Sequence, residues 1–108
     1  MAREVDLETF AGAWTVGAVV LDVREPEEYR AGHVPGARLA PMSTLAAALP
    51  HVPKGRTVYV ICASGNRSQW IADRLAAAGV DALSVAGGTR GWIGTGRPVV
   101  TGSAPGVV

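Results

Sequence analysis

Two short, continuously apolar segments restrict this chain to few possible folds. Residues 18–23 read Ala-Val-Val-Leu-Asp-Val, and residues 57–61 read Thr-Val-Tyr-Val-Ile. A continuous apolar run of this length is typical of a strand that is buried on both faces of a parallel sheet. Parallel strands need crossover connections, which are usually helices. The two segments therefore predict an α/β fold.

Segments with helical or strand signals alternate along the rest of the chain, separated by Gly and Pro. Asp6 is the predicted N-cap of the first helix, and Gly79 is the predicted stop of the longest one. Ser43 or Thr44 is the expected cap of a helix that Pro50 closes. Helices are expected at residues 6–14, 27–30, 45–49 and 68–78, further strands at 37–39 and 80–85, and a turn with one helical turn at 87–92.

The length of the chain predicts one domain. It has 108 residues, and a compact domain has about 100 to 150. We expect residues 1–100 to form this domain. The sequence from Gly94 onward is rich in Gly, Pro and Ser, so residues 101–108 are expected to form a flexible C-terminal tail.

The charge balance argues against two classes of partner. Ten Lys and Arg against nine Asp and Glu give a net charge of +1, whereas nucleic-acid and polybasic membrane surfaces need clustered positive charge. No apolar run approaches the roughly 20 residues of a membrane span, and residues 1–6 lack the apolar stretch of a signal peptide. We therefore expect a cytoplasmic protein that binds neither nucleic acid nor membrane, and no oligomeric state is predicted.

The single cysteine, Cys62, excludes an internal disulfide and a CxxC redox pair. A structural zinc site usually takes four Cys or His ligands, and this chain adds only His33 and His51, which lie far apart in the sequence. No metal site is predicted. A lone cysteine is either a small buried hydrophobic residue or a nucleophile, and its neighbours decide between the two.

The segment that follows Cys62 favours a nucleophile. It leaves a predicted buried strand and enters the N-terminus of a helix, which is where ligands bind in open α/β sheets. Backbone N–H groups and the helix dipole there lower a cysteine pKa from about 8.5. Arg67 adds a fixed charge, and Ser68 is expected to cap the helix. Besides the nucleophile Cys62, the candidate substrate-binding residues are Ala63, Ser64, Gly65, Asn66, Arg67 and Ser68.

Taken together, several segments resemble the rhodanese homology domain family. The first two signatures of that family are similar to Leu21–Tyr29 and Gly32–Ala37, and its active-site loop is similar to Cys62–Ser68. The Gly87-Gly88 pair, with Trp92 and Pro98 after it, resembles the closing motif of the family. The resemblance covers about Val5 to Pro98, in the family's order and spacing.

This resemblance implies a three-layer fold with a five-stranded parallel sheet flanked by helices. It also implies a thiosulfate sulfurtransferase in which Cys62 forms a persulfide. The sulfane sulfur would come from a small donor such as thiosulfate and pass to cyanide, a thiol or a protein acceptor, without a cofactor. One departure is Arg38, where the family usually has Asn; it is expected to affect the approach to the site and to leave the nucleophile unchanged.

Two other function classes compete with the sulfurtransferase. A non-catalytic rhodanese-like module would bind a partner or sense redox state, but such relatives usually lack the cysteine that this chain retains. Cysteine phosphatases and arsenate reductases carry C-x5-R, a loop large enough for a tetrahedral oxyanion. Four residues separate Cys62 from Arg67, which disfavours that class.

Four further residues are expected to support the site. Asp22, Arg24 and Glu28 are predicted to form buried or half-buried pairs that hold the first strand and the turn after it. Arg67 is left with two possible roles, a contact to the donor anion or an ion pair with Asp22 or Glu28. His33 is interpreted as a hydrogen-bonding turn residue.

Overall fold

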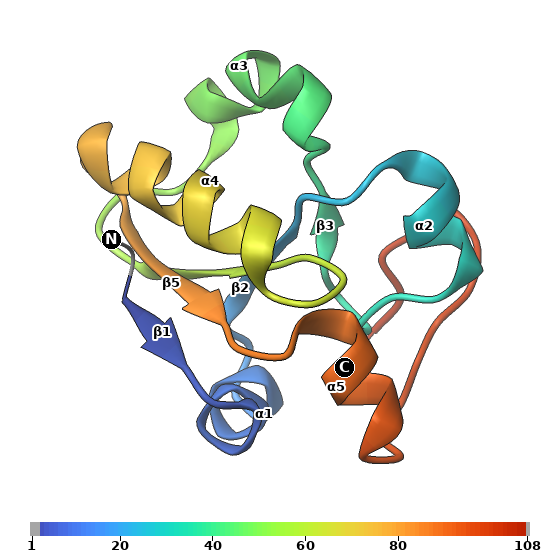
Figure 1. Ribbon diagram of the computed structural model, residues 1–108. Helices are drawn as coiled ribbons and strands as arrows, with labels where there is room; N and C mark the ends of the chain where they lie inside the picture. Colours follow the sequence, from blue (N-terminus) through green and yellow to red (C-terminus); the bar gives the residue numbers. More distant parts are fainter. Residues whose placement is uncertain (1–2, 108) are drawn as a thin grey trace.

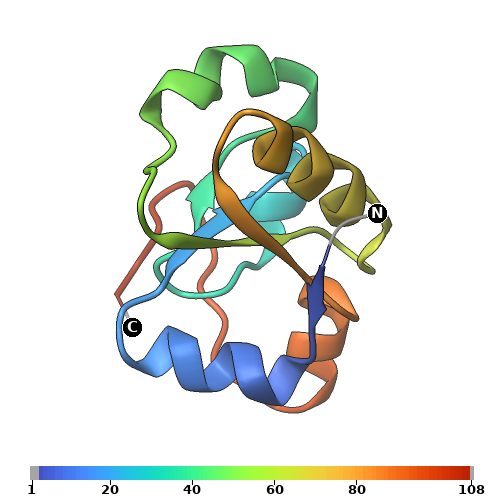
Figure 2. The ribbon, with the colours of Figure 1, turned by 90° about the vertical axis from the view of Figure 1, so that its left-hand side faces the viewer.

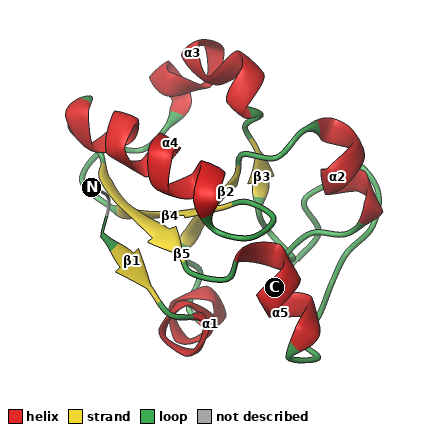
Figure 3. Cartoon of the chain, viewed as in Figure 1, coloured by secondary structure: helices red, strands yellow, loops and turns green. Residues whose placement is uncertain are grey.

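A computed structural model describes residues 3–107 of the chain. A five-stranded, fully parallel sheet lies between two layers of helices, as Figures 1 and 3 show. The predicted α/β fold with a five-stranded parallel sheet is confirmed. The strands run in the order β1-β5-β4-β2-β3 and comprise β1 (Glu4–Val5), β2 (Val19–Asp22), β3 (Arg38–Leu39), β4 (Thr57–Ile61) and β5 (Asp81–Val85).

The helices cover both faces of the sheet. In Figure 2 the helices α3 and α4 lie above it, and α1 and α5 lie below it. Asp6 caps α1 as predicted, because its carboxylate accepts a hydrogen bond from the N–H of Thr9 at 2.7 Å. The α-helices are α1 (Leu7–Thr15), α2 (Pro26–Ala31), α3 (Leu45–Ala48), α4 (Asn66–Ala77) and α5 (Gly88–Gly94), with 3-10 turns at Met42–Thr44 and Leu49–His51.

Two apolar clusters form the core, one on each face of the sheet. Successive residues of a strand point to opposite faces, so Val60 and Ile61 belong to different clusters. Val60 lies in the cluster that includes Ile71 and Leu75 of α4. The other cluster contains Phe10 of α1 and Trp92 of α5, whose rings meet edge to face at 5.4 Å between centroids.

The structure differs from the expected elements at the edge strand β1 and at the helix α5. The strand β1 was not expected from its sequence, because two residues carry no periodic signal. It forms by pairing with β5, where Glu4 aligns with Ser84 and Val5 with Val85. The turn expected at residues 87–92 begins a longer helix, α5, of seven residues.

The predicted helix caps agree only in part with the structure. Thr44, one of the two expected caps, occupies the N-cap position of α3, but its side chain makes no capping hydrogen bond, because its hydroxyl donates to the carbonyl of Pro41 at 3.5 Å. Pro50 lies inside the 3-10 turn that follows α3, so the helix ends earlier, at Ala48. Ser68 does not cap α4: the N-cap is Gly65, whose φ of +107° favours glycine, and Ser68 lies within the helix.

The segment after α5 returns to α2 and the turn after it, at the right of Figure 1. His33 and Val100 exchange two backbone hydrogen bonds of 2.9 Å, and the N–H of Gly36 donates to the carbonyl of Pro105 at 2.7 Å. The expected flexibility of residues 101–108 stays a prediction, and Val108 lies outside the described residues. Over residues 3–107, the structure contains no helix long and apolar enough to span a membrane.

Candidate active site at Cys62

Cys62 follows the last residue of β4, at the carboxyl end of the sheet. Four residues form the turn from this strand into α4, and Gly65 ends it in the left-handed conformation. A Cβ on Gly65 would lie 3.4 Å from the backbone nitrogen of Gly87, at the limit of ordinary van der Waals contact. Glycine is therefore favoured here by the backbone angle.

Hydrogen-bond donors surround the sulfur atom. The Cys62 side chain is buried, and the N–H of Gly65 donates to its Sγ at 3.0 Å. The hydroxyl of Ser68 lies 3.4 Å from the same Sγ. The Ser68 hydroxyl in turn lies 2.8 Å from the hydroxyl of Ser84 on β5, and both serines are fully buried. The sulfur thus lies at the end of a buried chain of two hydroxyls.

These contacts shift the ionisation of the thiol. Burial raises the pKa of Cys62. Hydrogen bonds from the Ser68 hydroxyl and from backbone N–H groups lower this pKa by more than burial raises it. Those N–H groups belong to Ser68, Gly65 and Ser64. The resulting pKa lies below the ordinary value of a cysteine thiol, which favours the nucleophilic thiolate.

The start of α5 holds the carbonyl groups of the turn. The N–H of Thr89 donates to the carbonyl of Cys62 at 2.8 Å, and the N–H of Arg90 donates to that of Ala63 at 3.0 Å. Gly88 permits this contact, because a Cβ at that position would lie 2.6 Å from the Cys62 oxygen. With its carbonyls bound to α5, the turn directs N–H groups toward the sulfur.

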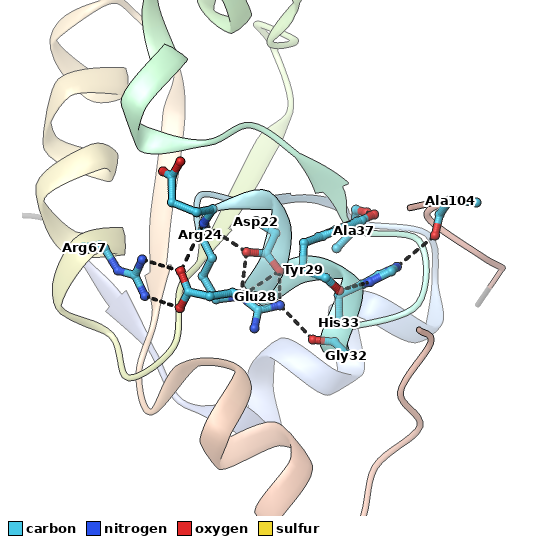
Figure 4. Close-up of polar contacts among 10 residues, drawn as sticks. Asp22, Arg24, Glu28, Tyr29, Gly32, His33, Ala37, Arg67 and Ala104 are labelled. Carbon is cyan, nitrogen blue, oxygen red and sulfur yellow. Dashed lines mark hydrogen bonds and ion pairs between the residues drawn. The ribbon is translucent and has the colours of Figure 1, made fainter. Parts of the chain in front are cut away.

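Arg67 forms an ion pair with Glu28 and not with Asp22. Its two terminal nitrogens each donate to one carboxylate oxygen at 2.8 Å, as Figure 4 shows. The hydrogen bond from Arg67 is the main reason that the pKa of Glu28 falls to about 2. The pair joins the first turn of α4 to α2, and each side chain is about one third exposed, at 35% and 37%.

A second ion pair lies inside the turn between β2 and α2. Asp22 is fully buried and accepts from the Nε and Nη2 groups of Arg24, at 2.9 and 2.7 Å. Arg24 also donates to the carbonyl of Gly32 at 2.9 Å (Figure 4). These bonds hold the end of β2 against the residue that follows α2.

His33 links α2 to the C-terminal segment. Its Nδ1 lies 2.8 Å from the carbonyl oxygen of Tyr29, and its Nε2 lies 2.9 Å from that of Ala104 (Figure 4). The ring stacks on Tyr29 with centroids 3.6 Å apart. Each ring nitrogen thus faces a backbone carbonyl oxygen, and the nitrogen that carries the hydrogen donates to the oxygen it faces.

The sequence model of the rhodanese-like domain matches residues 7–95, which is most of the chain. The chain belongs to the rhodanese-like domain family. A sulfurtransferase of Allochromatium vinosum is 32% identical over 103 residues, which cover 93% of this chain and 96% of that protein. Thiosulfate sulfurtransferase GlpE of Pseudomonas putida is 38% identical over 80 residues, 73% of each chain. The chain is thus of the rhodanese type and related to sulfurtransferases.

Solved structures agree with this membership of the rhodanese-like family. A rhodanese-related protein of Thermoplasma volcanium superposes with a TM-score of 0.85 at 33% identity, over 91% of this chain and 97% of that one. A rhodanese-like domain protein of Staphylococcus aureus gives a TM-score of 0.79 at 32% identity, over 83% and 90% of the two chains.

The rhodanese-like fold gathers the candidate loop around the sulfur and leaves the support residues on one side. Ser64 and Asn66 are exposed, Ala63 and Arg67 are half-buried, and Gly65 is buried. Asp22, Arg24, Glu28 and His33 all lie on or beside α2 (Figure 4). Of these four residues, Glu28 contacts the Cys62 loop directly, through its ion pair with Arg67.

Two residues of this rhodanese-like site, Ser84 and Thr89, were not predicted from the sequence. Ser84 gave one signal, a serine at a buried position of a strand, but nothing in the sequence linked it to Ser68. Thr89 lies beside the loop, and its hydroxyl is the one buried side-chain polar atom without a hydrogen-bond partner among residues 3–107. Both residues approach Cys62 only through the pairing of β4 with β5 and the docking of α5.

Two cavities lie away from the Cys62 loop, near the amino end of β2. The larger has a volume of about 370 Å³ and is lined by Arg38, His51 and Arg56 among others. The smaller is lined by Tyr59 and Arg56, among others. Arg38, the departure from the family pattern, therefore lines a cavity that does not include the cysteine. Over residues 3–107, no group of three His, Cys, Asp or Glu side chains lies close enough to hold a metal ion.

Proposed function

We propose that this protein is a thiosulfate-type sulfurtransferase that carries a sulfane sulfur on Cys62. The observation that supports this most is the buried sulfur with its hydrogen-bond donors: the N–H of Gly65 at 3.0 Å and the hydroxyl of Ser68 at 3.4 Å. A site of this kind stabilises a sulfur anion in the interior of a protein. The relationship to GlpE and other sulfurtransferases supports the same conclusion.

In the first half of the proposed reaction, the Cys62 thiolate attacks the outer sulfur of thiosulfate. A new S–S bond forms, and the bond between the two sulfur atoms of thiosulfate breaks. Sulfite leaves with the electron pair, and Cys62 becomes a persulfide anion. The charge is the same before and after the step, so the donors around the sulfur serve both forms of the protein.

In the second half, cyanide or a thiolate attacks the terminal sulfur of the persulfide. The S–S bond breaks, the electron pair returns to Cys62, and thiocyanate or a new persulfide leaves. Cys62 is the only cysteine of the chain, so no second internal thiol is available to take the sulfur. The acceptor is therefore an external small molecule or a protein thiol.

The intact mass of the protein tests this proposal. We expect thiosulfate to add one sulfur atom to the wild-type chain and cyanide to remove it. Cys62→Ser should neither gain sulfur nor form thiocyanate, and wild-type protein blocked with iodoacetamide is the matched control. Sulfur uptake by Cys62→Ser would refute the role of Cys62. A folded wild-type protein that gains no sulfur from thiosulfate would instead favour the non-catalytic binding module.

A further inference from the structure

The hydrogen-bond chain at Cys62 extends further than the loop. Ser84 lies on β5, and its hydroxyl makes one hydrogen bond, to the Ser68 hydroxyl at 2.8 Å. Ser68 has two side-chain contacts, Ser84 and the Cys62 sulfur at 3.4 Å. Both serines are fully buried, so water does not replace a missing partner.

The number of hydrogens shared by the two hydroxyls and the sulfur indicates which form of the sulfur they suit. Two hydrogen bonds connect these groups, one between Ser84 and Ser68 and one between Ser68 and Cys62, and each uses one hydrogen. A neutral thiol brings a third hydrogen: the thiol then donates to the Ser68 hydroxyl, Ser68 donates to Ser84, and the Ser84 hydroxyl hydrogen has no hydrogen-bond acceptor among residues 3–107. A thiolate leaves two hydrogens for two links, with every donor directed toward the sulfur.

We propose that Ser84 is a positioning residue for Cys62: its hydroxyl donates to Ser68 and thereby directs the Ser68 hydrogen to the sulfur. Because hydrogen bonds in a chain polarise one another, the donated bond also strengthens the Ser68 contact to an anion. The persulfide of the proposed function also has no hydrogen on Sγ, so the same arrangement of hydroxyls suits it. Only this extension to the persulfide rests on the proposed function.

A shift of the Cys62 pKa in a Ser84 variant would not come from the charged groups near the loop. Arg67 pairs with Glu28, and Arg24 pairs with Asp22. Arg90 of α5 also lies beside the loop, where its N–H donates to the carbonyl of Ala63. Substitution of the uncharged Ser84 leaves all five groups in place, so a change in the Cys62 titration would report the two hydroxyls.

The pH dependence of alkylation tests the proposal on the full chain. Iodoacetamide reacts with the thiolate, and Cys62 is the only cysteine, so the rate reports this residue alone. We expect Ser84→Ala to move the midpoint up by about half a pKa unit, which slows alkylation about threefold below the midpoint. Ser68→Ala removes the direct donor and should shift the midpoint by about one unit, or about tenfold.

Two further variants separate positioning from packing. Ser84→Thr keeps the hydroxyl and should restore a midpoint close to that of the wild type. Val85→Ala opens a cavity one residue along β5 but on the other face, so it should lower the Tm and leave the midpoint unchanged. A Ser84→Ala profile that superposes on the wild type, or a Val85→Ala profile that shifts as far as Ser84→Ala, would overturn the proposal.

Alkylation does not require sulfur transfer, so the two proposals fail separately. A shifted midpoint in Ser84→Ala, together with no sulfur uptake by the wild type, would retain the positioning role and reject the thiosulfate activity. Normal sulfur uptake by the wild type, together with identical alkylation profiles for the wild type and Ser84→Ala, would retain the thiosulfate activity and reject the positioning role of Ser84.

Discussion

At the scale of single residues, Arg67 shows how the site balances its charges. A cation in the first turn of a helix opposes the helix dipole and needs a nearby anion. Glu28 provides one with two hydrogen bonds of 2.8 Å. Both terminal nitrogens donate to Glu28, and this pair joins the start of α4 to α2. A contact between Arg67 and the donor anion stays a prediction.

We expect Glu28→Gln to lower the stability by about 1 kcal/mol at neutral pH, because the pair is one third exposed and screened by water. The folded-state pKa of Glu28 is about 2, below the ordinary value of 4.5 for a glutamate carboxyl group. A lowered carboxyl pKa stabilises the fold above the unfolded value, and this contribution is lost as the pH falls from 4.5 toward 2. Urea unfolding at several pH values should therefore show wild type and Glu28→Gln converging in acid. A difference that stays constant down to pH 2 would contradict this.

Asp22 should be far more sensitive than Glu28. Asp22→Ala leaves the buried guanidinium of Arg24 without its partner, and breaking a buried pair costs about 3 to 5 kcal/mol. Glu27→Ala is the matched control, because Glu27 is an exposed acid of the same segment. Its effect should stay within about 0.5 kcal/mol. Equal losses for the two variants in urea unfolding would argue against a structural role of the Asp22–Arg24 pair.

At the scale of elements, the site depends on the contact between α5 and the turn after β4. The first N–H groups of α5 bind the carbonyls of Cys62 and Ala63. This satisfies donors that a helix otherwise leaves without partners, and it fixes the peptide planes of the turn. The orientation of the donors at the sulfur therefore depends on a helix about 25 residues further along the chain.

Gly88→Ala should disrupt this contact. Its Cβ would meet the Cys62 oxygen at 2.6 Å and the Ala63 oxygen at 2.7 Å, and φ is +58°. We expect a loss of at least about 2 kcal/mol and a raised Cys62 pKa, measured by thermal unfolding and alkylation.

Gly94→Ala, in the same helix, is the control for Gly88→Ala. No atom lies within 4 Å of its added Cβ, so it should be neutral or stabilise the helix by up to about 1 kcal/mol. Matching effects of the two substitutions would show that the contact with the loop is not what requires glycine at position 88.

At the scale of the whole molecule, the C-terminal segment packs against α2 and the turn that follows it. The C-terminal segment contributes hydrogen bonds from Gly102 to Arg30, from Gly36 to Pro105, and between His33 and Ala104. These contacts favour a segment anchored to the domain, whereas the composition favours a flexible tail. Of the support residues around α2, His33 contacts this segment directly, through its backbone bonds to Val100 and through the side-chain contact with Ala104.

Truncation after Val100 distinguishes these possibilities. Three hydrogen bonds would be lost, at about 1 kcal/mol each, so we expect the stability to fall by about 2 to 3 kcal/mol and the Tm with it. Truncation after Gly106 keeps all three and should leave the Tm unchanged. If both truncations melt like the full chain, residues 101–108 are the flexible tail that the composition predicts.

Features that depend on a few neighbouring residues could be predicted from the sequence. The apolar run Thr57–Ile61 coincides with β4, and the Asp6 carboxylate caps α1. Both features depend on the side chains of a few adjacent residues. The turn from Cys62 into a helix was predicted for the same reason. The sheet as a whole followed from the resemblance to a family.

Only the tertiary structure decided the features that join distant residues. Arg67 lies 39 positions from Glu28, and Ser68 lies 16 positions from Ser84, so no local pattern could choose these partners. The strand β1 exists only because β5 offers an edge to pair with. The sequence thus predicted Cys62 as the nucleophile, and the packing of α2, β5 and α5 set the hydrogen bonds around this residue, because those depend on which atoms folding brings within about 3 Å.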